Sequence, residues 1–255
     1  MTLPLRWIDT AFLGRAAFDV GVSRALLREV SRGRAPETLR LYRPDDVLAF
    51  SSTDLRRPGF PEALRAARGA GFDAALRLAG GSAAVFHRQT LAFAWCSPEQ
   101  EARQGIRSRF ERIAERVARA LRGLGVDARV GAVPGEYCPG EYSVNAGGRR
   151  KLMGVGQRVV RGGAHVGGVI VVGDRARASQ GLEPVYRALG LDYLGEATGC
   201  IEDEIGPVEV ETVRDALLAE IAREREVCQV ALDAETLAGA AFFEPSHRLP
   251  DDGAD

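Results

Sequence analysis

GGRRKLMGVGQ, residues 147–157 of this 255-residue chain, is the segment that says most about its fold. Its glycine pair predicts a tight turn that joins two antiparallel strands, over residues 142–146 and 151–160. Lys151, in the second strand, is the sole lysine of the sequence, and all other cationic side chains besides histidine are arginines. A compact ammonium is not interchangeable with a guanidinium. Lys151 is therefore either a functional residue or a chance survivor of a composition bias.

Strand-like and helical patterns lie on both sides of this hairpin. Apolar runs predict short strands at residues 38–42, 47–51, 74–78, 83–86, 91–96 and 126–130, and an interior strand at 165–172. Periodic apolar positions predict helices at residues 23–32, 61–70, 182–189, 210–224 and 234–240, and a longer one that begins after Ser97-Pro98-Glu99, with Pro98 at its first position, and ends near Leu124. The elements do not alternate strictly, so we expect an α+β fold with a mixed β-sheet core and packed helices.

The composition excludes several classes of protein. Apolar residues make up 45% and charged residues 27%, which is typical of a globular protein. A net charge of −1 argues against a nucleic-acid partner, and no apolar run is long enough for a membrane span. The acidic Asp9 comes too early for a secretory signal. Four scattered cysteines and three histidines predict reduced thiols in the cytoplasm and no metal site.

A glycine-rich segment at residues 80–83 is a candidate ligand site. Gly154-Val155-Gly156 lacks the third glycine of a dinucleotide motif, and no Gly-Lys-Ser/Thr is present. Gly80-Gly81-Ser82-Ala83 would let a ligand lie against backbone amides, with Arg77 close enough to meet an anion. The alternative is a plain hairpin turn between two strands.

Cys138 is the leading candidate nucleophile. It lies in a loop at residues 133–141 that is rich in proline and glycine, 13 positions before Lys151. A nearby cation would lower the pKa of its thiol, whereas the alternative is an incidental loop cysteine. Cys200 is a second candidate, and Cys96 and Cys228 have the surroundings of small buried apolar residues. His165, at the start of a strand, either donates a hydrogen bond to a ligand carbonyl or is a satisfied structural histidine.

Four blocks of sequence together resemble one enzyme family. They are LRWID at residues 5–9, LRLYRP at 39–44, RLAGGSAAVFH at 77–87, and KLMGVGQ at 151–157 followed by HVGG at 165–168. These blocks resemble the lipoate–protein ligase and octanoyltransferase family, whose relatives are the biotin–protein ligases. The third and fourth blocks are similar to the family's Arg-Arg-x-Ser-Gly-Gly-Gly-Ala-Val-Tyr-His stretch and to its lysine motif.

This chain departs from the family pattern in the third block. Leu78 stands where the family has a second arginine, and Gly80, Ser82 and Ala83 replace its Ser-Gly-Gly. Arg88 follows His87 where an aspartate is common. The departures lie where the acyl chain and the adenylate of a ligase would bind, so they weigh against the use of ATP.

The resemblance implies a fold, an activity and partners. We expect a biotin/lipoate ligase-like catalytic domain over residues 1–228 and a short C-terminal helix with a frayed tail over 229–255. The implied reaction transfers an octanoyl or lipoyl group to a lysine of lipoyl-carrier domain proteins through an acyl-cysteine on Cys138. Lys151 would orient the acyl carbonyl, and no cofactor would be needed. Acyl carrier protein, or free lipoate or octanoate, would supply the group, and neither nucleic acid nor membrane would take part.

Two alternatives remain open. In an ATP-dependent lipoate–protein ligase, which uses ATP and Mg²⁺, Lys151 would contact a lipoyl-adenylate. A non-catalytic scaffold that binds acyl groups or carriers is the third possibility. In the transferase, Val155 and Val169 would help to wall a slot for an eight-carbon tail, whose burial is worth roughly 5 kcal/mol at about 0.8 kcal/mol per methylene. Besides Cys138 and Lys151, the expected substrate-binding residues are Arg77, Gly80, Gly81, Ser82, Ala83, Val85, His87, Gly154, Gln157, His165 and Gly167.

Overall fold

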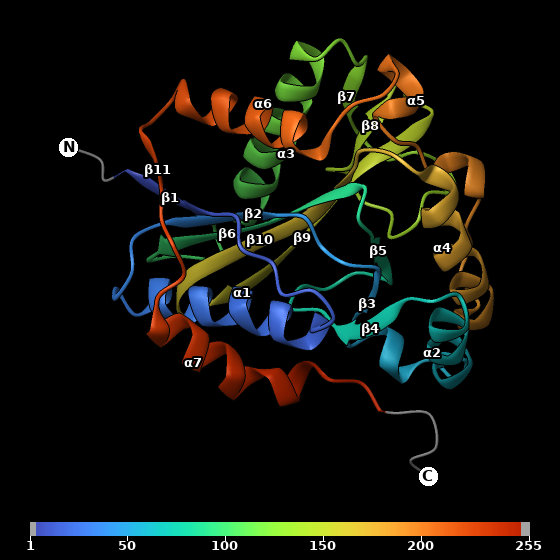
Figure 1. Cartoon of the computed structure of the whole chain (residues 1–255), viewed down its shortest axis with the longest axis horizontal. Helices are drawn as coiled ribbons and strands as arrows, with labels where there is room; N and C mark the ends of the chain where they lie inside the picture. The colour runs from blue at the N-terminus through green and yellow to red at the C-terminus, as the bar shows by residue number, and fades with distance from the viewer. Residues whose placement is uncertain (1–3, 251–255) are drawn as a thin grey trace.

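Two β-sheets form the framework of the computed structural model, which describes residues 4–250 (Figure 1). The larger sheet has eight strands in the order β11-β1-β2-β6-β10-β9-β8-β7, and the smaller has three in the order β4-β3-β5. Strand β1 pairs in parallel with β11 and β2, and the other pairs of the larger sheet are antiparallel. The strands are β1 (Leu5–Ile8), β2 (Thr38–Tyr42), β3 (Val47–Phe50), β4 (Asp73–Leu76), β5 (Ala84–Phe86), β6 (Thr90–Glu99), β7 (Ala128–Val130), β8 (Val144–Ala146), β9 (Arg150–Val160), β10 (Gly162–Val171) and β11 (Val227–Gln229).

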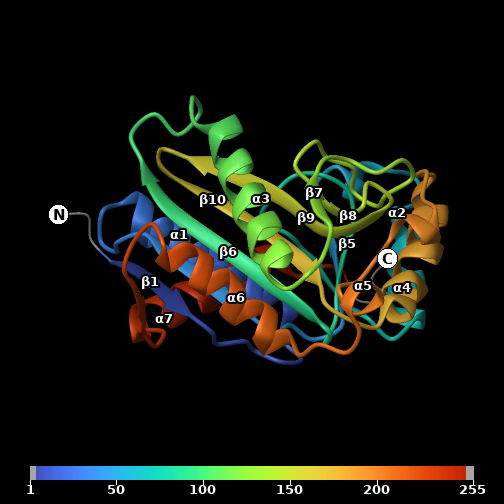
Figure 2. The ribbon, with the colours of Figure 1, turned by 90° about the horizontal axis from the view of Figure 1, so that it is seen from above.

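Helices cover both faces of the larger sheet. Helices α3 and α6 pack together on one face and α1 and α7 on the other, as Figures 1 and 2 show. Helices α2 and α4 pack against each other beside the smaller sheet. The helices are α1 (Ala16–Ser31), α2 (Phe60–Gly69), α3 (Ile106–Gly123), α4 (Arg175–Leu189), the short α5 (Glu202–Ile205), α6 (Val210–Ala222) and α7 (Ala234–Phe243). This arrangement confirms the expected α+β class.

Each layer has its own apolar core. Helix α3 buries Ile113, Val117 and Leu121, which belong to one cluster with Phe93 and Trp95 of β6. These positions follow the helical period, so a single face of α3 meets the sheet. On the opposite face α1 contributes a second cluster, and the smaller sheet forms a third with α2 and α4. An apolar cavity lies where the second and third clusters meet the larger sheet.

The hairpin predicted around residues 147–148 is present. Gly147 and Gly148 have φ values of +57° and +75°, and Ala146 pairs with Arg150 across the turn. Strand β10 lies between β6 and β9 in the interior of the larger sheet, which confirms the expectation from its continuous apolar run.

Two predicted helix starts were wrong. Pro98 lies in strand β6 and does not start a helix; α3 begins at Ile106. The proline is tolerated because the pairing of β2 with β6 ends at Cys96. Beyond that residue, the edge of β6 that faces β2 has no neighbouring strand to accept a backbone hydrogen bond. The alternative of a plain hairpin turn at residues 80–81 is excluded, because this segment joins β4 to β5 and β3 separates these strands. Helix α1 begins at Ala16, before the predicted residue 23, and β11 was not expected.

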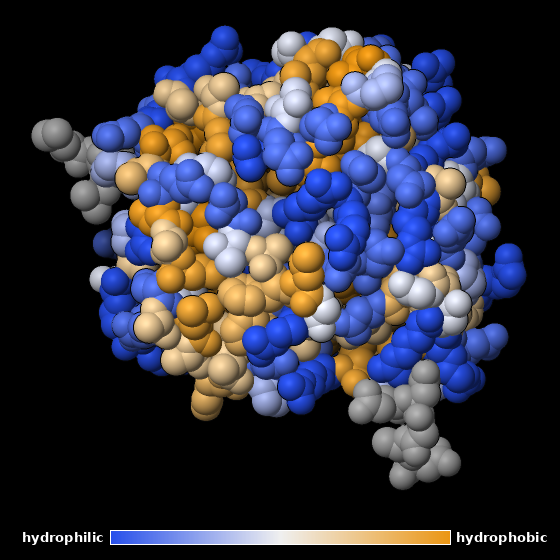
Figure 3. Space-filling model, viewed as in Figure 1, coloured by the Kyte–Doolittle hydropathy of each residue, from blue (hydrophilic) through white to orange (hydrophobic). Residues whose placement is uncertain are grey.

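The face of the molecule that is seen in Figure 1 is largely polar. Figure 3 shows hydrophilic side chains over much of the face seen in Figure 1, with apolar side chains gathered at the lower left, over α1 and α7. Within residues 4–250, no helix combines the length and the apolar character that crossing a membrane requires. Residues 251–255 of the predicted tail lie outside the described part of the chain.

Candidate active site

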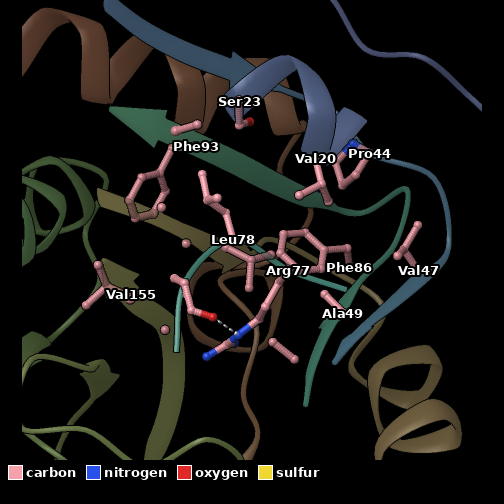
Figure 4. Close-up of a pocket in the computed structure, with 18 of the residues that line it drawn as sticks. Val20, Ser23, Pro44, Val47, Ala49, Arg77, Leu78, Phe86, Phe93 and Val155 are labelled. Carbon is pink, nitrogen blue, oxygen red and sulfur yellow. Dashed lines mark hydrogen bonds between the residues drawn. The ribbon is translucent and has the colours of Figure 1, made fainter. Parts of the chain in front are cut away.

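An apolar cavity of about 110 Å³ lies between α1, the smaller sheet and strands β6, β9 and β10. Figure 4 shows aliphatic and aromatic side chains around it, with Arg77 among them. Its apolar walls include Val20, Val47, Phe86, Phe93, Val155 and Val169, and its polar lining includes Asp19, Ser23, Arg77, Cys138 and His165. A cavity of this character suits a hydrophobic chain with a polar reactive end.

Cys138 is held in an unusual backbone conformation at one side of this cavity. Its φ is +42°, in the left-handed region that few residues other than glycine adopt. Its backbone N–H donates to the hydroxyl of Tyr186 at 2.7 Å, and that hydroxyl donates to the carbonyl of Ala83 at 2.8 Å. Tyr186 belongs to α4 and is fully buried. A buried helix side chain therefore ties the cysteine loop to the segment that leads into β5.

The sulfur of Cys138 lies against the glycine-rich segment. The N–H of Ser82 donates to Sγ at 3.3 Å, and the Arg77 guanidinium lies 3.5 Å from it. Gly81 has a φ of +108°, and a Cβ there would lie 2.7 Å from Sγ and would also collide with Arg77. Only glycine permits this approach. Residues 80–82 thus form one wall of the cysteine site.

The surroundings favour the thiolate form of Cys138. Burial alone would raise the pKa of the thiol. The positive charges of Arg77 and Lys151, with hydrogen bonds from Arg77 and the N–H of Ser82, outweigh burial and hold the pKa below the ordinary value of 9.0. A thiol with a lowered pKa and access to a cavity has the character of a nucleophile.

Lys151 is completely buried beneath the cysteine loop. Its ammonium donates to Glu136 Oε1 at 3.1 Å, to the carbonyl of Tyr137 at 2.8 Å and to the carbonyl of Cys138 at 2.8 Å. These three acceptors match the three protons of an ammonium. Burial lowers the pKa of Lys151 below its ordinary value, although Glu136 and Cys138 act in the opposite direction. The ammonium therefore contacts the loop that carries Cys138 and does not line the cavity.

Glu136 completes this buried arrangement. Its carboxylate accepts hydrogen bonds from the N–H groups of Val133 and Gly140, at 2.9 and 3.0 Å, and from the hydroxyl of Ser143 at 2.7 Å. Both Glu136 and its partner Lys151 have side chains with no exposed surface. Such a fully bonded buried pair fixes the conformation of the loop on either side of Cys138.

Cys138 also lines a second groove, of about 360 Å³, which we call the outer groove. Cys138, Val155 and Gly156 line both this outer groove and the apolar cavity. The rings of Phe110 and Tyr142, which also line the outer groove, stack with their centroids 5.2 Å apart. The sulfur is therefore placed between an apolar cavity and a groove with aromatic walls.

Most of the residues expected from the sequence surround Cys138. The cavity is lined by Arg77, Gly154, His165 and Gly167, and the outer groove by Gly80, Gly81 and Gln157. Ser82 contacts the sulfur of Cys138, and Ala83 contacts Tyr186. Val85 and His87 lie elsewhere. Neighbouring side chains of β5 point to opposite faces, so Ala84 and Phe86 line the cavity while Val85 packs in the core of the smaller sheet.

All three histidines are buried, and His87 and His165 have strongly lowered pKa values. Burial lowers the pKa of His165 and of His87 to about 4. His165 lines the cavity, and its Nδ1 has no hydrogen-bond partner among residues 4–250. His87 lies in the turn after β5, where its Nδ1 accepts from the N–H of Gln89 at 3.3 Å. His165 is thus available to a ligand in the cavity.

The other cysteines have different surroundings. Cys200 is buried, and burial raises the pKa of its thiol to about 11. Cys96 is buried, as expected, whereas Cys228 is exposed because β11 lies at the edge of the larger sheet. Within residues 4–250, no group of three or more histidine, cysteine, aspartate or glutamate side chains could hold a metal ion.

Sequence reasoning missed three residues of this site. Glu136 and Tyr137 directly precede the expected cysteine. An acidic residue in the same loop as the nucleophile was a signal that could have been used. Tyr186 gave no signal, because it lies 48 positions from Cys138 within an ordinary helical pattern.

Comparisons with known proteins found a matching family and related structures. The sequence model of the family described as "Lipoyl protein ligase A/B catalytic domain" matches residues 15–222. The chain is 27% identical over 220 residues to an octanoyl-[GcvH]:protein N-octanoyltransferase of Geobacillus kaustophilus, covering 85% of this chain and 76% of that protein. It is 25% identical over 253 residues to the protein of the same name from Bacillus velezensis, covering 96% and 87%. The crystal structure of a lipoate-protein ligase A bound with ATP has the same fold, with a TM-score of 0.78, 19% identity and coverage of 95% of both chains.

Proposed function

Since the chain belongs to the lipoyl protein ligase A/B catalytic domain family, we propose that it transfers an octanoyl group to a lysine of a lipoyl-carrier domain. The names of its two bacterial relatives support octanoyl as the group and a carrier protein as its donor. The observation that carries the proposal is the position of Cys138. Its sulfur, with a lowered pKa, stands where the apolar cavity meets the outer groove.

The first step forms an acyl-enzyme on Cys138. The thiolate attacks the octanoyl carbonyl carbon while the eight-carbon tail occupies the apolar cavity. The bond between the carbonyl and the donor carrier breaks, a thioester to Sγ forms, and the leaving atom of the carrier takes a proton from water. Arg77 and the N–H of Ser82, which contact Sγ in the free protein, are the nearest donors to stabilise charge that develops on the carbonyl oxygen.

The second step releases the product. The amine of the acceptor lysine enters through the outer groove, where Phe110 and Tyr142 would pack against its methylene groups. It attacks the thioester carbonyl, an amide forms, and the Cys138 thiolate leaves while the amine loses a proton to water. Lys151 acts through the loop in this scheme: it holds the carbonyls of Tyr137 and Cys138 and favours the thiolate.

Mass spectrometry tests the acyl-enzyme directly. After incubation with an octanoylated carrier, the peptide that contains Cys138 should gain one octanoyl group, and Cys138→Ala should gain none. The donor is tested as octanoyl-GcvH and as octanoyl-acyl carrier protein. Undiminished transfer by Cys138→Ala would contradict the mechanism. Pyrophosphate exchange into ATP that depends on lipoate would instead support the ligase reaction, with ATP and Mg²⁺.

The free thiols among the described residues support the cytoplasm as the location.

A further inference from the structure

A third groove, of about 700 Å³, adjoins the active site and has an unusual charge. Its charged lining consists of arginines from α1, from the segment after β4 and from β9, without any aspartate or glutamate. We call this surface the arginine groove; its members are Arg24, Arg28, Arg32, Arg77 and Arg158. Because the whole chain has a net charge of −1, this concentration of positive charge is local.

Most of these arginines are not neutralised within the described chain. Arg32 and Arg158 are exposed, and neither has an ion-pair partner among residues 4–250. Arg24 donates to the hydroxyl of Ser246 at 2.7 Å and lies over the ring of Phe243, which are uncharged partners. Arg28 is the exception, because it pairs with Glu29 at 3.0 Å. The groove therefore keeps an excess of positive charge.

The positions of the arginines make them repel one another. Arg24 and Arg28 of α1 and Arg32, which caps its C-terminal end, follow each other at every fourth residue, so they lie along one side of the helix over about 12 Å. Like charges at this spacing destabilise a helix. Arg158 on β9 lines the same groove, and after burial its charge is the second cause that lowers the pKa of Arg24. An anionic partner in the groove would relieve this repulsion.

The arginine groove is continuous with the active site. Gly80 and Gln157 line both it and the outer groove that reaches Cys138. Arg77 and Leu78 line both it and the apolar cavity. A protein bound to these arginines would therefore also lie at the entrance of the outer groove, which leads to the sulfur of Cys138.

We propose that the arginine groove is the docking surface for an acidic face of the lipoyl-carrier domain, a proposal that rests on the proposed transferase function. Carboxylates of the carrier pair with Arg24, Arg32 and Arg158, and the octanoyl-bearing or acceptor lysine beside them then enters the outer groove. The site needs a protein partner at this entrance, and the charge of the groove determines that the contacting face of that partner is acidic.

Charge reversal separates docking from chemistry. In Arg32→Glu/Arg158→Glu we expect KM for an octanoylated carrier to rise by about tenfold or more, and the effect to shrink as salt screens the charges. The rate at which the parent and this variant acylate Cys138 from octanoyl-N-acetylcysteamine, a small neutral donor, should be equal. Arg32→Gln/Arg158→Gln, which removes the charges without reversing them, should give a smaller rise in KM.

Arg65→Glu/Arg187→Glu is the matched control, because both residues are exposed and lie on α2 and α4, outside the groove. It should leave KM for the carrier unchanged. Equal KM values for the parent and Arg32→Glu/Arg158→Glu, or an equal loss with the small donor, would overturn the docking proposal. Failure of the parent to acylate Cys138 from either donor would instead overturn the proposed function. Circular dichroism and thermal unfolding establish that each variant is folded.

Discussion

At the scale of single residues, the approach of Gly81 to the sulfur of Cys138 leaves no room for a methyl group. We expect Gly81→Ala to slow acylation of Cys138 by about 100-fold, because a displacement of about 1 Å at a reacting atom has that effect. Gly80→Ala is the matched control, since no atom lies within 4 Å of the position of its Cβ. Acylation rates with the small octanoyl donor measure both. Equal rates for Gly81→Ala and the parent would show that the sulfur does not react from this position.

The charge of Arg77 should set the pH at which Cys138 becomes reactive. The pKa of this thiol is lowered, so the thiolate persists above that pKa and is lost as the pH falls through it. In Arg77→Gln the pKa should rise, and the acidic limb of the rate of alkylation by iodoacetamide should move to higher pH. Arg88→Gln removes an exposed arginine that pairs with Asp45, and it should leave the profile in place. An unchanged limb in Arg77→Gln would contradict this origin of the lowered pKa.

Residues with a local signal could be predicted from the sequence, and residues with distant partners could not. Lys151 stands out by its rarity and Cys138 by its loop, and the structure places the ammonium 2.8 Å from the carbonyl of that cysteine. The direction of the ammonium was not predictable. It depends on the fold of residues 133–143 around Glu136, which no pattern within the loop determines.

At the scale of elements, Tyr186 connects helix α4 to the cysteine loop and to the start of β5. Tyr186→Phe keeps the ring and leaves the N–H of Cys138 without its acceptor. We expect a loss of stability of about 1–3 kcal/mol and a slower acylation of Cys138. Urea unfolding and the small-donor assay measure the two effects.

Tyr193→Phe serves as the control for this substitution. Its ring lies 5.3 Å from that of Tyr186, but its hydroxyl bonds to Thr198 and not to the cysteine loop. It should acylate Cys138 at the parent rate. If both variants lost the same activity, packing around the two rings would be the cause and the hydrogen bond to Cys138 would not.

The pair of Asp19 and Arg40 joins helix α1 to strand β2 in the interior. Arg40 is completely buried and also donates to the carbonyl of Thr10. Asp19→Ala would leave this guanidinium without its counter-charge, and we expect a loss of about 3 kcal/mol in the free energy of unfolding. Asp127→Ala breaks a pair with Arg129 that is exposed on both sides, and it should leave stability unchanged. Urea unfolding compares the two variants.

The elements themselves were predicted best where neighbouring residues determine them. The β8–β9 hairpin needs only the two glycines between its strands. The alternative of a hairpin between β4 and β5 failed because β3, which separates these strands, precedes both in the sequence. Pro98 was assigned to a helix because the few residues around a proline do not distinguish a helix start from a strand that lacks a neighbour on one side.

At the scale of the whole molecule, the buried histidines should make the fold sensitive to acid. His87 and His165 have pKa values of about 4 in the folded state, against an ordinary value of 6.5. The unfolded chain therefore binds protons first as the pH falls, and stability should decrease between pH 6.5 and about 4. The slope is roughly 1.4 kcal/mol per pH unit for each histidine that titrates.

His87→Gln tests this expectation without altering a residue that lines the cavity. Urea unfolding across the same pH range should show a shallower dependence in the variant than in the parent. An identical slope would show that protonation of His87 does not contribute to the acid sensitivity.

The burial of Lys151 has a consequence for an enzyme that makes reactive thioesters. Primary amines are the natural targets of an activated acyl group, and this chain withholds its single side-chain amine beneath a loop with every proton engaged. An arginine-coated surface can attract a carrier without offering it a competing nucleophile. The enzyme is thereby protected from acylating its own lysine, and the lysine of the incoming substrate is the only one that the acyl group can reach.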